Sequence, residues 1–172
     1  MSTSRQTLSR HGVMVCIDGK GVLISGQAGI GKSSLALELI GQGHQLVADD
    51  VVELSVENGR LMAACPNMLQ GLLHSRELGM IDVNSVFGKQ AWQIRCQLDL
   101  LLELTETPVT NHALTANISS SRILGQSVPR LYLSIHNPAT LANRLQTWLK
   151  MQAQQLDGEA EIKRRQQQLM QQ

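Results

Sequence analysis

Aromatic side chains are scarce in this sequence, which has one phenylalanine, one tyrosine and two tryptophans in 172 residues. Proteins that bind single-stranded nucleic acid stack its bases on aromatic rings, and this chain has too few of them for such a platform. Charge of one sign is also lacking, because fifteen lysines and arginines are balanced by fourteen aspartates and glutamates. The sequence therefore predicts no broad basic surface for nucleic acid or for an anionic membrane.

Cysteines are few and far apart. Cys16, Cys65 and Cys96 are odd in number and form no Cys-x-x-Cys pair, which argues against a disulfide framework or a zinc ribbon and favours a reducing compartment. Residues 1–10 contain no apolar stretch typical of a secretory signal, and no apolar run approaches the roughly 20 residues of a membrane-spanning helix. We therefore expect a cytoplasmic protein with no membrane association and with buried thiols.

The length is sufficient for one domain with an extensive core, since a domain of roughly 150 residues buries about 70% of the surface of its unfolded chain. Hydrophobic residues make up 42% of the chain, which excludes disorder throughout. We expect a polar leader over residues 1–10 and a domain over residues 11–150. The glutamine-rich residues 151–172 are expected to form a helical or disordered tail.

Hydrophobic patterning predicts where strands and helices lie. Apolar runs at 13–17 and 22–25 flank an Asp-Gly turn and predict a β-hairpin. Further strands are predicted at 46–48, 51–56, 61–65 and 131–135, and the apolar segment 93–104 is predicted to contain a strand that ends at residues 100–102. One helix is predicted over residues 33–40, and another begins at Pro138 with an apolar stripe of Leu141, Leu145, Trp148, Leu149 and Leu156. The stretches expected to be irregular are 66–92 and 105–121.

A glycine-rich loop follows the predicted hairpin and precedes the first helix. Its residues, Gly26 to Ser33, match G-x-x-x-x-G-K-[ST] at every fixed position. The glycines let backbone N–H groups turn toward phosphate oxygens, and the helix N-terminus adds a positive dipole. Lys32 can reach the β- and γ-phosphates, and the Ser33 hydroxyl can ligate Mg²⁺. We predict a site for a nucleoside triphosphate or related polyphosphate at Gly26, Gln27, Ala28, Gly29, Ile30, Gly31, Lys32, Ser33 and Ser34.

Two adjacent carboxylates end the predicted strand 46–48. Asp49 and Asp50 thus lie at the carboxyl end of a strand, which is where α/β sheets bind their ligands. Neighbouring side chains of a strand point to opposite faces, so the two aspartates are expected to differ in role. A P-loop needs a carboxylate near its metal ion, and a reacting hydroxyl needs a base. The residues alone leave open a second interpretation, in which both are solvated acids at a turn.

Four segments together resemble the catalytic domain of bacterial HPr kinase/phosphorylase: His11–Val13, the Gly26–Ser33 loop, Gly43–Asp50 and Leu78–Gly88. Enzymes of that family use ATP to phosphorylate a serine of HPr, the phosphocarrier of the sugar phosphotransferase system. They can also reverse the reaction with phosphate, giving pyrophosphate. The resemblance implies an α/β P-loop (Walker A) kinase domain with a mixed sheet flanked by helices, similar to the HPr kinase/phosphoenolpyruvate carboxykinase-like fold. It also implies a truncated form without the family's N-terminal domain, and a homo-oligomer, which is a hexamer in the family.

The resemblance also implies roles for individual residues. Lys32 would hold the donor phosphate, and Ser33 and Asp49 would hold Mg²⁺. Asp50 would take the proton from the target serine, with His11 against it and the reacting phosphate. His74 stands where the family has a metal-binding glutamate, and an imidazole suits Mn²⁺ better than Mg²⁺.

The leading hypothesis is therefore an ATP-dependent protein-serine kinase that acts on HPr or a related phosphocarrier and so regulates carbohydrate metabolism. The family's arginine- and proline-rich loop for the reverse reaction is reduced to Gln126–Arg130 here, so phosphorylase activity is not expected, although pyrophosphate is an alternative donor in the family. Two other hypotheses stay open: a kinase of a small hydroxyl substrate, and an ATP-binding regulator without phosphoryl transfer.

Overall fold

The computed structural model of the protein describes residues 6–108 and 113–171. The strands of its main sheet are, in spatial order, β1 (Thr7–His11), β5 (Val51–Glu57), β6 (Arg60–Ala64), β9 (Arg95–Thr105), β3 (Lys20–Ser25), β2 (Val13–Ile17) and β4 (Gln45–Ala48). In addition, β11 (Gln126–Ser134) pairs with the C-terminal part of β9, and β10 (Ile118–Ile123) pairs with β11. β9 runs parallel to β3 and β11, whereas the other pairs are antiparallel, so the sheet is mixed.

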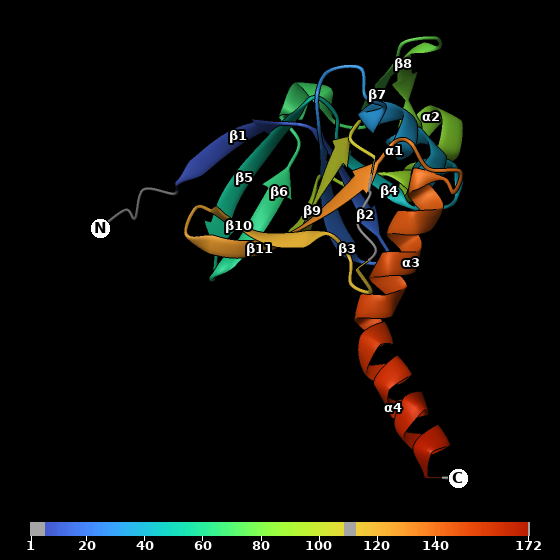
Figure 1. Cartoon of the computed structure of the whole chain (residues 1–172). Helices are drawn as coiled ribbons and strands as arrows, with labels where there is room; N and C mark the ends of the chain where they lie inside the picture. The colour runs from blue at the N-terminus through green and yellow to red at the C-terminus, as the bar shows by residue number, and fades with distance from the viewer. Residues whose placement is uncertain (1–5, 109–112, 172) are drawn as a thin grey trace.

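Two helices, α1 (Lys32–Gly41) and α3 (Leu141–Ala153), lie on one side of the sheet (Figure 1). Strand β2 shows how both faces of the sheet are covered, because all five of its residues are buried. Its odd-numbered residues join the core that contains α1 and α3, and its even-numbered residues join a second core with β5 and β6. Successive side chains of a strand point to opposite faces, so a doubly covered strand requires an uninterrupted apolar run.

The predicted elements of the first 65 residues are confirmed within one or two residues at each end. β2 and β3 form the expected antiparallel hairpin, and the glycine-rich loop joins β3 to α1. β4, β5 and β6 follow in the predicted order. The strand predicted within 93–104 is β9, which continues to Thr105, beyond the predicted end at residues 100–102. β1 had no predicted counterpart. It comes mostly from the segment that we separated as a polar leader, and it pairs with β5.

The prediction that residues 66–92 are irregular is wrong. They contain a separate two-stranded sheet of β7 (Leu72–Ser75) and β8 (Gly79–Asp82), followed by α2 (Val83–Phe87). Leu73 alone is fully buried within β7, so these four-residue strands carry no apolar alternation that would reveal them. Short 3₁₀ turns complete this stretch: η1 (Asn67–Leu69) and η2 (Lys89–Ala91).

The second predicted loop also contains a strand. β10 occupies the end of the stretch 105–121, of which 109–112 lie outside the described residues. An outer strand that meets solvent needs no continuous apolar pattern, which is why the serine-rich β10 resembles a loop in sequence. β11 begins at Gln126 instead of residue 131. The segment Gln126–Arg130 is therefore strand and not a shortened loop, so it carries no information on the reverse reaction.

The last part of the domain is helical, with later boundaries than predicted. α3 begins at Leu141 and not at Pro138, because the Thr140 hydroxyl caps it by accepting a hydrogen bond from the Asn143 N–H at 3.1 Å. The predicted stripe packs against the core except for Leu156, which lies beyond the end of α3 and is exposed.

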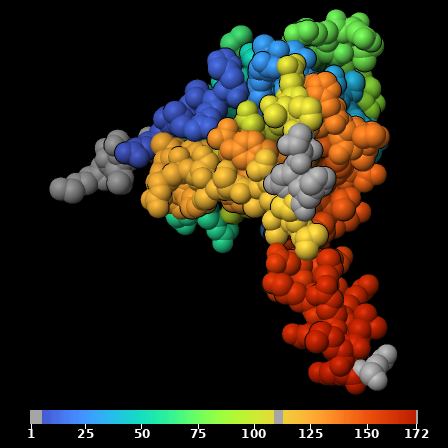
Figure 2. Space-filling model, in the orientation of Figure 1, coloured from blue at the N-terminus to red at the C-terminus, as the bar shows by residue number. Residues whose placement is uncertain are grey.

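The C-terminal tail is helical, which is one of the two predicted alternatives. α4 (Gly158–Met170) has no buried residue, and Figure 2 shows it standing clear of the rest of the molecule. Ion pairs one turn apart line its surface, including Lys163–Glu159 at 3.0 Å and Arg165–Glu161 at 2.8 Å. No helix within the described ranges has the length and apolar character that a bilayer crossing requires.

The three cysteines are free thiols. Cys16 and Cys96 lie on β2 and β9, the two strands that flank β3 with Gly21. Cys16 and Cys65 are buried as predicted, whereas Cys96 is half-buried. A hydrogen bond from Cys96 lowers the pKa of Cys16 to about 7, although burial opposes this shift. A Cβ atom on Gly21 would lie 2.9 Å from the Cys96 sulfur. Because Gly21 has no side chain, the Cys96 sulfur can pack close to its backbone.

Gly21→Ala is expected to lower the free energy of unfolding by about 3 kcal/mol, because overpacking displaces backbone. A Cβ at this position would lie only 1.8 Å from the Gln97 carbonyl oxygen and 2.7 Å from the Met14 methyl carbon. Urea denaturation measures the effect. The control is Gly41→Ala, where the new Cβ would meet nothing within 4 Å apart from its chain neighbours and the backbone of its own helix. Equal denaturation midpoints for the two variants would contradict the expected clash.

Candidate active site

One large cavity, of about 1100 Å³, opens where β3 leads into α1. The glycine-rich loop forms one wall, the start of β2 and the end of β4 form another, and the β7–β8 hairpin closes a third side. Figure 1 shows this hairpin beside α1, which contacts β7. Most of the predicted site residues line this cavity, namely His11, Gly26, Ala28, Gly29, Gly31, Lys32, Ser33, Ser34, Asp49, Asp50 and His74. Segments distant in sequence are thus brought together as the motifs predicted.

Two predicted loop residues do not line the cavity. Gln27 has an exposed side chain, and Ile30 is buried in the core under α1. The loop nevertheless uses both through their backbones, since the Ile30 N–H donates to the Gln27 carbonyl at 3.2 Å. The Ile30 side chain therefore anchors the loop in the core.

The glycines of the loop adopt backbone angles that other residues rarely reach. Gly29 has φ 79° and Gly31 has φ 111°, and L-residues with a Cβ seldom adopt this region. Lys32 opens α1, and its ammonium donates to the carbonyl oxygens of Gly26 at 2.9 Å and Gln27 at 3.0 Å. The carbonyls of the loop therefore hold the ammonium over the loop, where the lysine of a P-loop binds phosphate oxygens.

Asp49 connects two walls of the cavity. Its carboxylate is largely buried, and one oxygen accepts a hydrogen bond from the Ser33 hydroxyl at 3.1 Å. The other oxygen accepts from the backbone N–H of His74 at 2.8 Å. One carboxylate thus joins the first turn of α1 to the β7–β8 hairpin. Because a carboxylate oxygen keeps a second lone pair, the Ser33 and Asp49 oxygens can still act together on a hard cation.

Asp50 occupies a strained turn next to the buried Asp49. The Val51 N–H donates to the Asp49 carbonyl at 2.9 Å, so Asp50 is the middle residue of a three-residue turn and has φ 69°. Such backbone angles at non-glycine residues concentrate at functional sites. The side chain is 78% exposed, and its oxygen lies 3.7 Å from Nδ1 of His11. The two aspartates therefore occupy different environments, and the cause is this turn and not strand alternation.

His74 reaches the site mainly through its backbone. Its N–H binds Asp49, while its exposed imidazole belongs to the cavity lining. Among the described residues, no three His, Cys, Asp or Glu side chains are grouped as a metal site would require. A Mg²⁺ ion held by one or two protein oxygens and by substrate phosphates needs no such group, so Ser33 and Asp49 fit this kind of coordination.

Sequence reasoning missed a polar network beneath the glycine-rich loop. The carboxylate of Glu103 accepts hydrogen bonds from the Ser25 hydroxyl at 2.6 Å and from the Arg130 guanidinium at 2.9 Å. Burial alone would raise the pKa of Glu103, but these hydrogen bonds and the charge of Lys32 outweigh it and lower the pKa below its usual value. The network fixes Ser25, which immediately precedes the loop. Its members come from three strands, and no local motif marks them.

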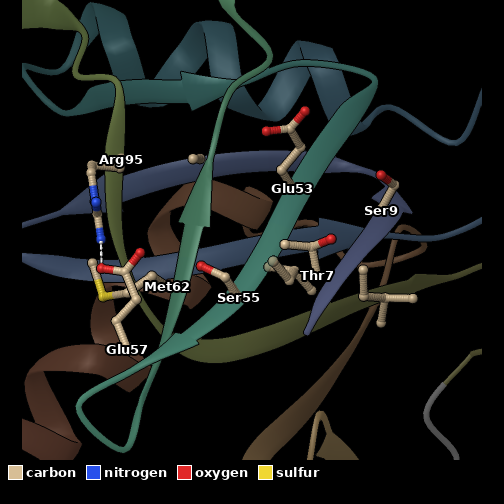
Figure 3. Close-up of a pocket in the computed structure, with 10 residues that line it drawn as sticks. Thr7, Ser9, Glu53, Ser55, Glu57, Met62 and Arg95 are labelled. Carbon is tan, nitrogen blue, oxygen red and sulfur yellow. Dashed lines mark hydrogen bonds and ion pairs between the residues drawn. The ribbon is translucent and has the colours of Figure 1, made fainter. Parts of the chain in front are cut away.

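A second cavity, of about 380 Å³, lies over β1, β5, β6 and β9 (Figure 3). Hydroxyl side chains such as Thr7, Ser9 and Ser55 line it, and at one end Arg95 forms an ion pair with Glu57. It shares no lining residue with the first cavity and contains none of the predicted site residues. The candidate chemistry is therefore confined to the larger cavity.

Comparisons with known proteins agree with this geometry. The family model of the HPr Serine kinase C-terminal domain matches residues 3–169. An HPr kinase/phosphorylase from Leptothrix cholodnii is 36% identical over 154 residues, which is 87% of this chain and 47% of that protein. One from Bordetella pertussis is 48% identical over 99 residues, which is 57% of this chain and 32% of that protein. The chain thus spans about half the length, or less, of these relatives.

A solved structure has the same fold. The structure of the Hpr(Ser) kinase/phosphatase from Coxiella burnetii superposes with a TM-score of 0.81 at 33% identity, covering 91% of this chain and 97% of that chain. This likeness confirms the predicted α/β fold with its mixed sheet and flanking helices. With the family model matched over nearly the whole sequence, the chain belongs to the family of HPr serine kinase C-terminal domains.

Proposed function

We propose that this protein is an ATP-dependent protein-serine kinase whose substrate is HPr or a related phosphocarrier. The observation that carries the proposal is that the glycine-rich loop and the Asp50–His11 pair open into one cavity. A phosphate-binding loop alone serves many reactions, but a neighbouring exposed carboxylate adds a base for a hydroxyl substrate. The names of the relatives, HPr kinase/phosphorylase, support a protein serine as that substrate.

In this proposal the loop and the metal ligands position the donor. The loop N–H groups and Lys32 bind the phosphates of ATP, and Lys32 exchanges its bonds to the Gly26 and Gln27 carbonyls for phosphate oxygens. Ser33 and Asp49 hold Mg²⁺, whose chemistry is to neutralise charge on the phosphate oxygens. Because Asp49 also binds the hairpin backbone, its carboxylate keeps one orientation, which lowers the entropic cost of ordering the site.

Asp50 then acts as the general base. The serine oxygen attacks the γ-phosphorus, the bond from that phosphorus to the β–γ bridging oxygen breaks, and ADP leaves. The serine proton moves to the Asp50 carboxylate, which is exposed and so accessible to a protein substrate. His11, at 3.7 Å, orients this carboxylate from the end of β1.

The test is incubation with γ-labelled ATP, Mg²⁺ and purified HPr, followed by mass mapping of the phosphorylated residue. We expect one phosphoserine on HPr, and no label with Lys32→Ala. Label on a small hydroxyl compound and none on HPr would make the protein a small-molecule kinase. ATP binding without transfer to any acceptor would make it a nucleotide-binding regulator.

His74→Glu is expected to raise the affinity for ATP with Mg²⁺ about tenfold, which is the lower end of effects measured for residues around metal ligands. His74 lines the cavity with Ser33 and Asp49, and a carboxylate offers Mg²⁺ the oxygen ligands that an imidazole lacks. Steady-state transfer rates at several Mg²⁺ and Mn²⁺ concentrations should show a smaller preference for Mn²⁺. His136→Glu, outside the cavity, is the control. Loss of Mg²⁺-dependent activity in His74→Glu would show that the imidazole has a role of its own.

A further inference from the structure

Three sulfur-containing side chains meet beside Gly21, at the end of β3 that is remote from the glycine-rich loop. Cys16 on β2 is directly opposite Gly21 in the register of the hairpin, so its Cβ lies about 5 Å from where a Cβ on Gly21 would be. That position would also lie 2.9 Å from the Cys96 sulfur and 2.7 Å from the methyl carbon of Met14, which is bonded to the thioether sulfur. All three side chains pack into the same core. The missing side chain of Gly21 thus lets two thiols and a thioether approach one another.

The Cys16 sulfur is held in place by hydrogen bonds and is shielded from solvent. Its partners are the Cys96 thiol, the side chain of Gln93 and the backbone of Gly19. Cys16 is buried and Cys96 is half-buried, so the space between the two sulfurs can be reached past Cys96. A ligand at this point would meet sulfur atoms whose orientation is already fixed.

The charge next to the two thiols is negative. Asp99 on β9 acts on both Cys16 and Cys96, and its carboxylate accepts a hydrogen bond from the Gly21 N–H at 2.9 Å. A negative charge opposes the formation of thiolates, and a cation bound between the sulfurs would reverse this effect. The electrostatics of the group therefore favour a positively charged ligand.

The kinds of ligand atom select the class of cation. Within residues 6–108 and 113–171, no three His, Cys, Asp or Glu side chains are grouped to hold a metal ion, so the tetrahedral set of a structural zinc ion is not present there. Mg²⁺ and Ca²⁺ bind oxygen ligands and do not suit a pair of thiols. Thiolates and thioethers are the ligands of soft ions such as Cu(I).

We propose that Cys16 and Cys96, together with the thioether of Met14, form a binding site for a soft monovalent metal ion, Cu(I). The ion would take the place of the thiol protons, which pass to solvent, and its oxidation state would not change. It would link β2 to β9 across Gly21 of the intervening strand. The site is separate from the large cavity, whose lining contains none of these three residues.

Affinity is the first measurement. The full chain is titrated with Cu(I) without oxygen, in competition with the chromophoric chelator bathocuproine disulfonate, and we expect one ion per chain. Cys16→Ala and Cys96→Ala should each lower the affinity by at least about a hundredfold, the upper end of the loss measured for outer partners of metal ligands. Met14→Leu preserves the volume and removes only the sulfur, so its loss should be smaller.

Cys65→Ala is the matched control. Cys65 is also a buried free thiol of the same core, but it is not part of the group beside Gly21. This variant should bind one Cu(I) with unchanged affinity. Equal affinities for Cys16→Ala, Cys96→Ala and Cys65→Ala would overturn the proposal.

X-ray absorption of the Cu(I)-loaded, unmodified protein is the second measurement, and it does not depend on whether a variant folds. We expect a first coordination shell of sulfur alone. A shell that contains nitrogen would place the ion at histidines instead and would contradict the proposed site.

Thermal unfolding with and without Cu(I) is the third measurement. An ion that binds the native state raises the unfolding midpoint, whereas one that prefers the unfolded chain lowers it. The midpoint should rise for the unmodified protein and for Cys65→Ala, but not for Cys16→Ala. A lower midpoint for the unmodified protein would show that its thiols bind Cu(I) better when unfolded, against the proposal. These three measurements involve neither nucleotide nor acceptor protein, so their outcome is independent of the proposed kinase function.

Discussion

Asp50→Asn should lower the rate of phosphoryl transfer to HPr by about 10²- to 10⁴-fold, the usual contribution of a general base, and leave ATP affinity nearly unchanged. The amide has the same shape but cannot take the serine proton. Asparagine also tolerates the positive φ of 69° at this position, so the turn is preserved, which alanine would not guarantee. Steady-state transfer rates and calorimetric ATP titrations measure the two expectations separately.

Asp49→Asn is the informative comparison for this variant. An amide oxygen can still accept from the Ser33 hydroxyl, but the NH₂ group cannot accept from the His74 N–H. Asp49→Asn should therefore loosen the hairpin and raise the Mg²⁺ concentration that activity requires, while the base remains. An inactive Asp49→Asn with an active Asp50→Asn would mean that the proposed roles are exchanged.

Lys32→Ala should abolish most of the stabilisation that ATP gives to the folded protein. A ligand that binds only the native state adds RT ln(1 + [L]/Kd), or about 2.7 kcal/mol at a hundredfold excess over Kd. Lys32 supplies the ammonium at the loop, and no other lysine belongs to the cavity lining. The thermal shift is measured for each variant against its own ATP-free sample, because Lys32→Ala also removes the bonds to the Gly26 and Gln27 carbonyls.

Lys20→Ala serves as the control for this experiment. Lys20 is exposed at the start of β3, at the opposite end of that strand from the glycine-rich loop. It should retain the full shift with ATP. An equal thermal shift in Lys32→Ala would mean that the glycine-rich loop does not bind the nucleotide. It would remove the main support for the proposed function.

The parts of the site that could be predicted are those in which neighbouring residues carry the chemistry. The loop from Gly26 to Ser33 is one contiguous motif, so its place between β3 and α1 was predictable from the sequence. Asp49 and Asp50 were also found, because a strand ends beside them. Their environments differ because of the tight turn at Asp50, which the alternation of side chains along a strand does not predict.

The parts that could not be predicted depend on contacts between distant segments. Arg76, in the β7–β8 turn, lies against Gly29, and Asp49 joins that hairpin to α1. Glu103 and Ser25 are 78 residues apart, and Arg130 joins them from a third strand. Such pairs have no local spacing, and the strands that present Arg76 are too short to show an apolar period. Predicting these contacts requires knowing which strands are neighbours in the sheet.

The exposed helix α4 determines how the thermal experiments must be recorded. None of its residues is buried, and an isolated helix of this length is marginally stable in water, so surface ion pairs alone hold it weakly. Its melting is therefore uncoupled from that of the sheet and its two cores, and loss of helicity on heating is not a two-state signal. Trp92 and Trp148, which pack against the core under α1, report the cooperative transition, and their fluorescence separates nucleotide effects on the domain from fraying of its C-terminal helix.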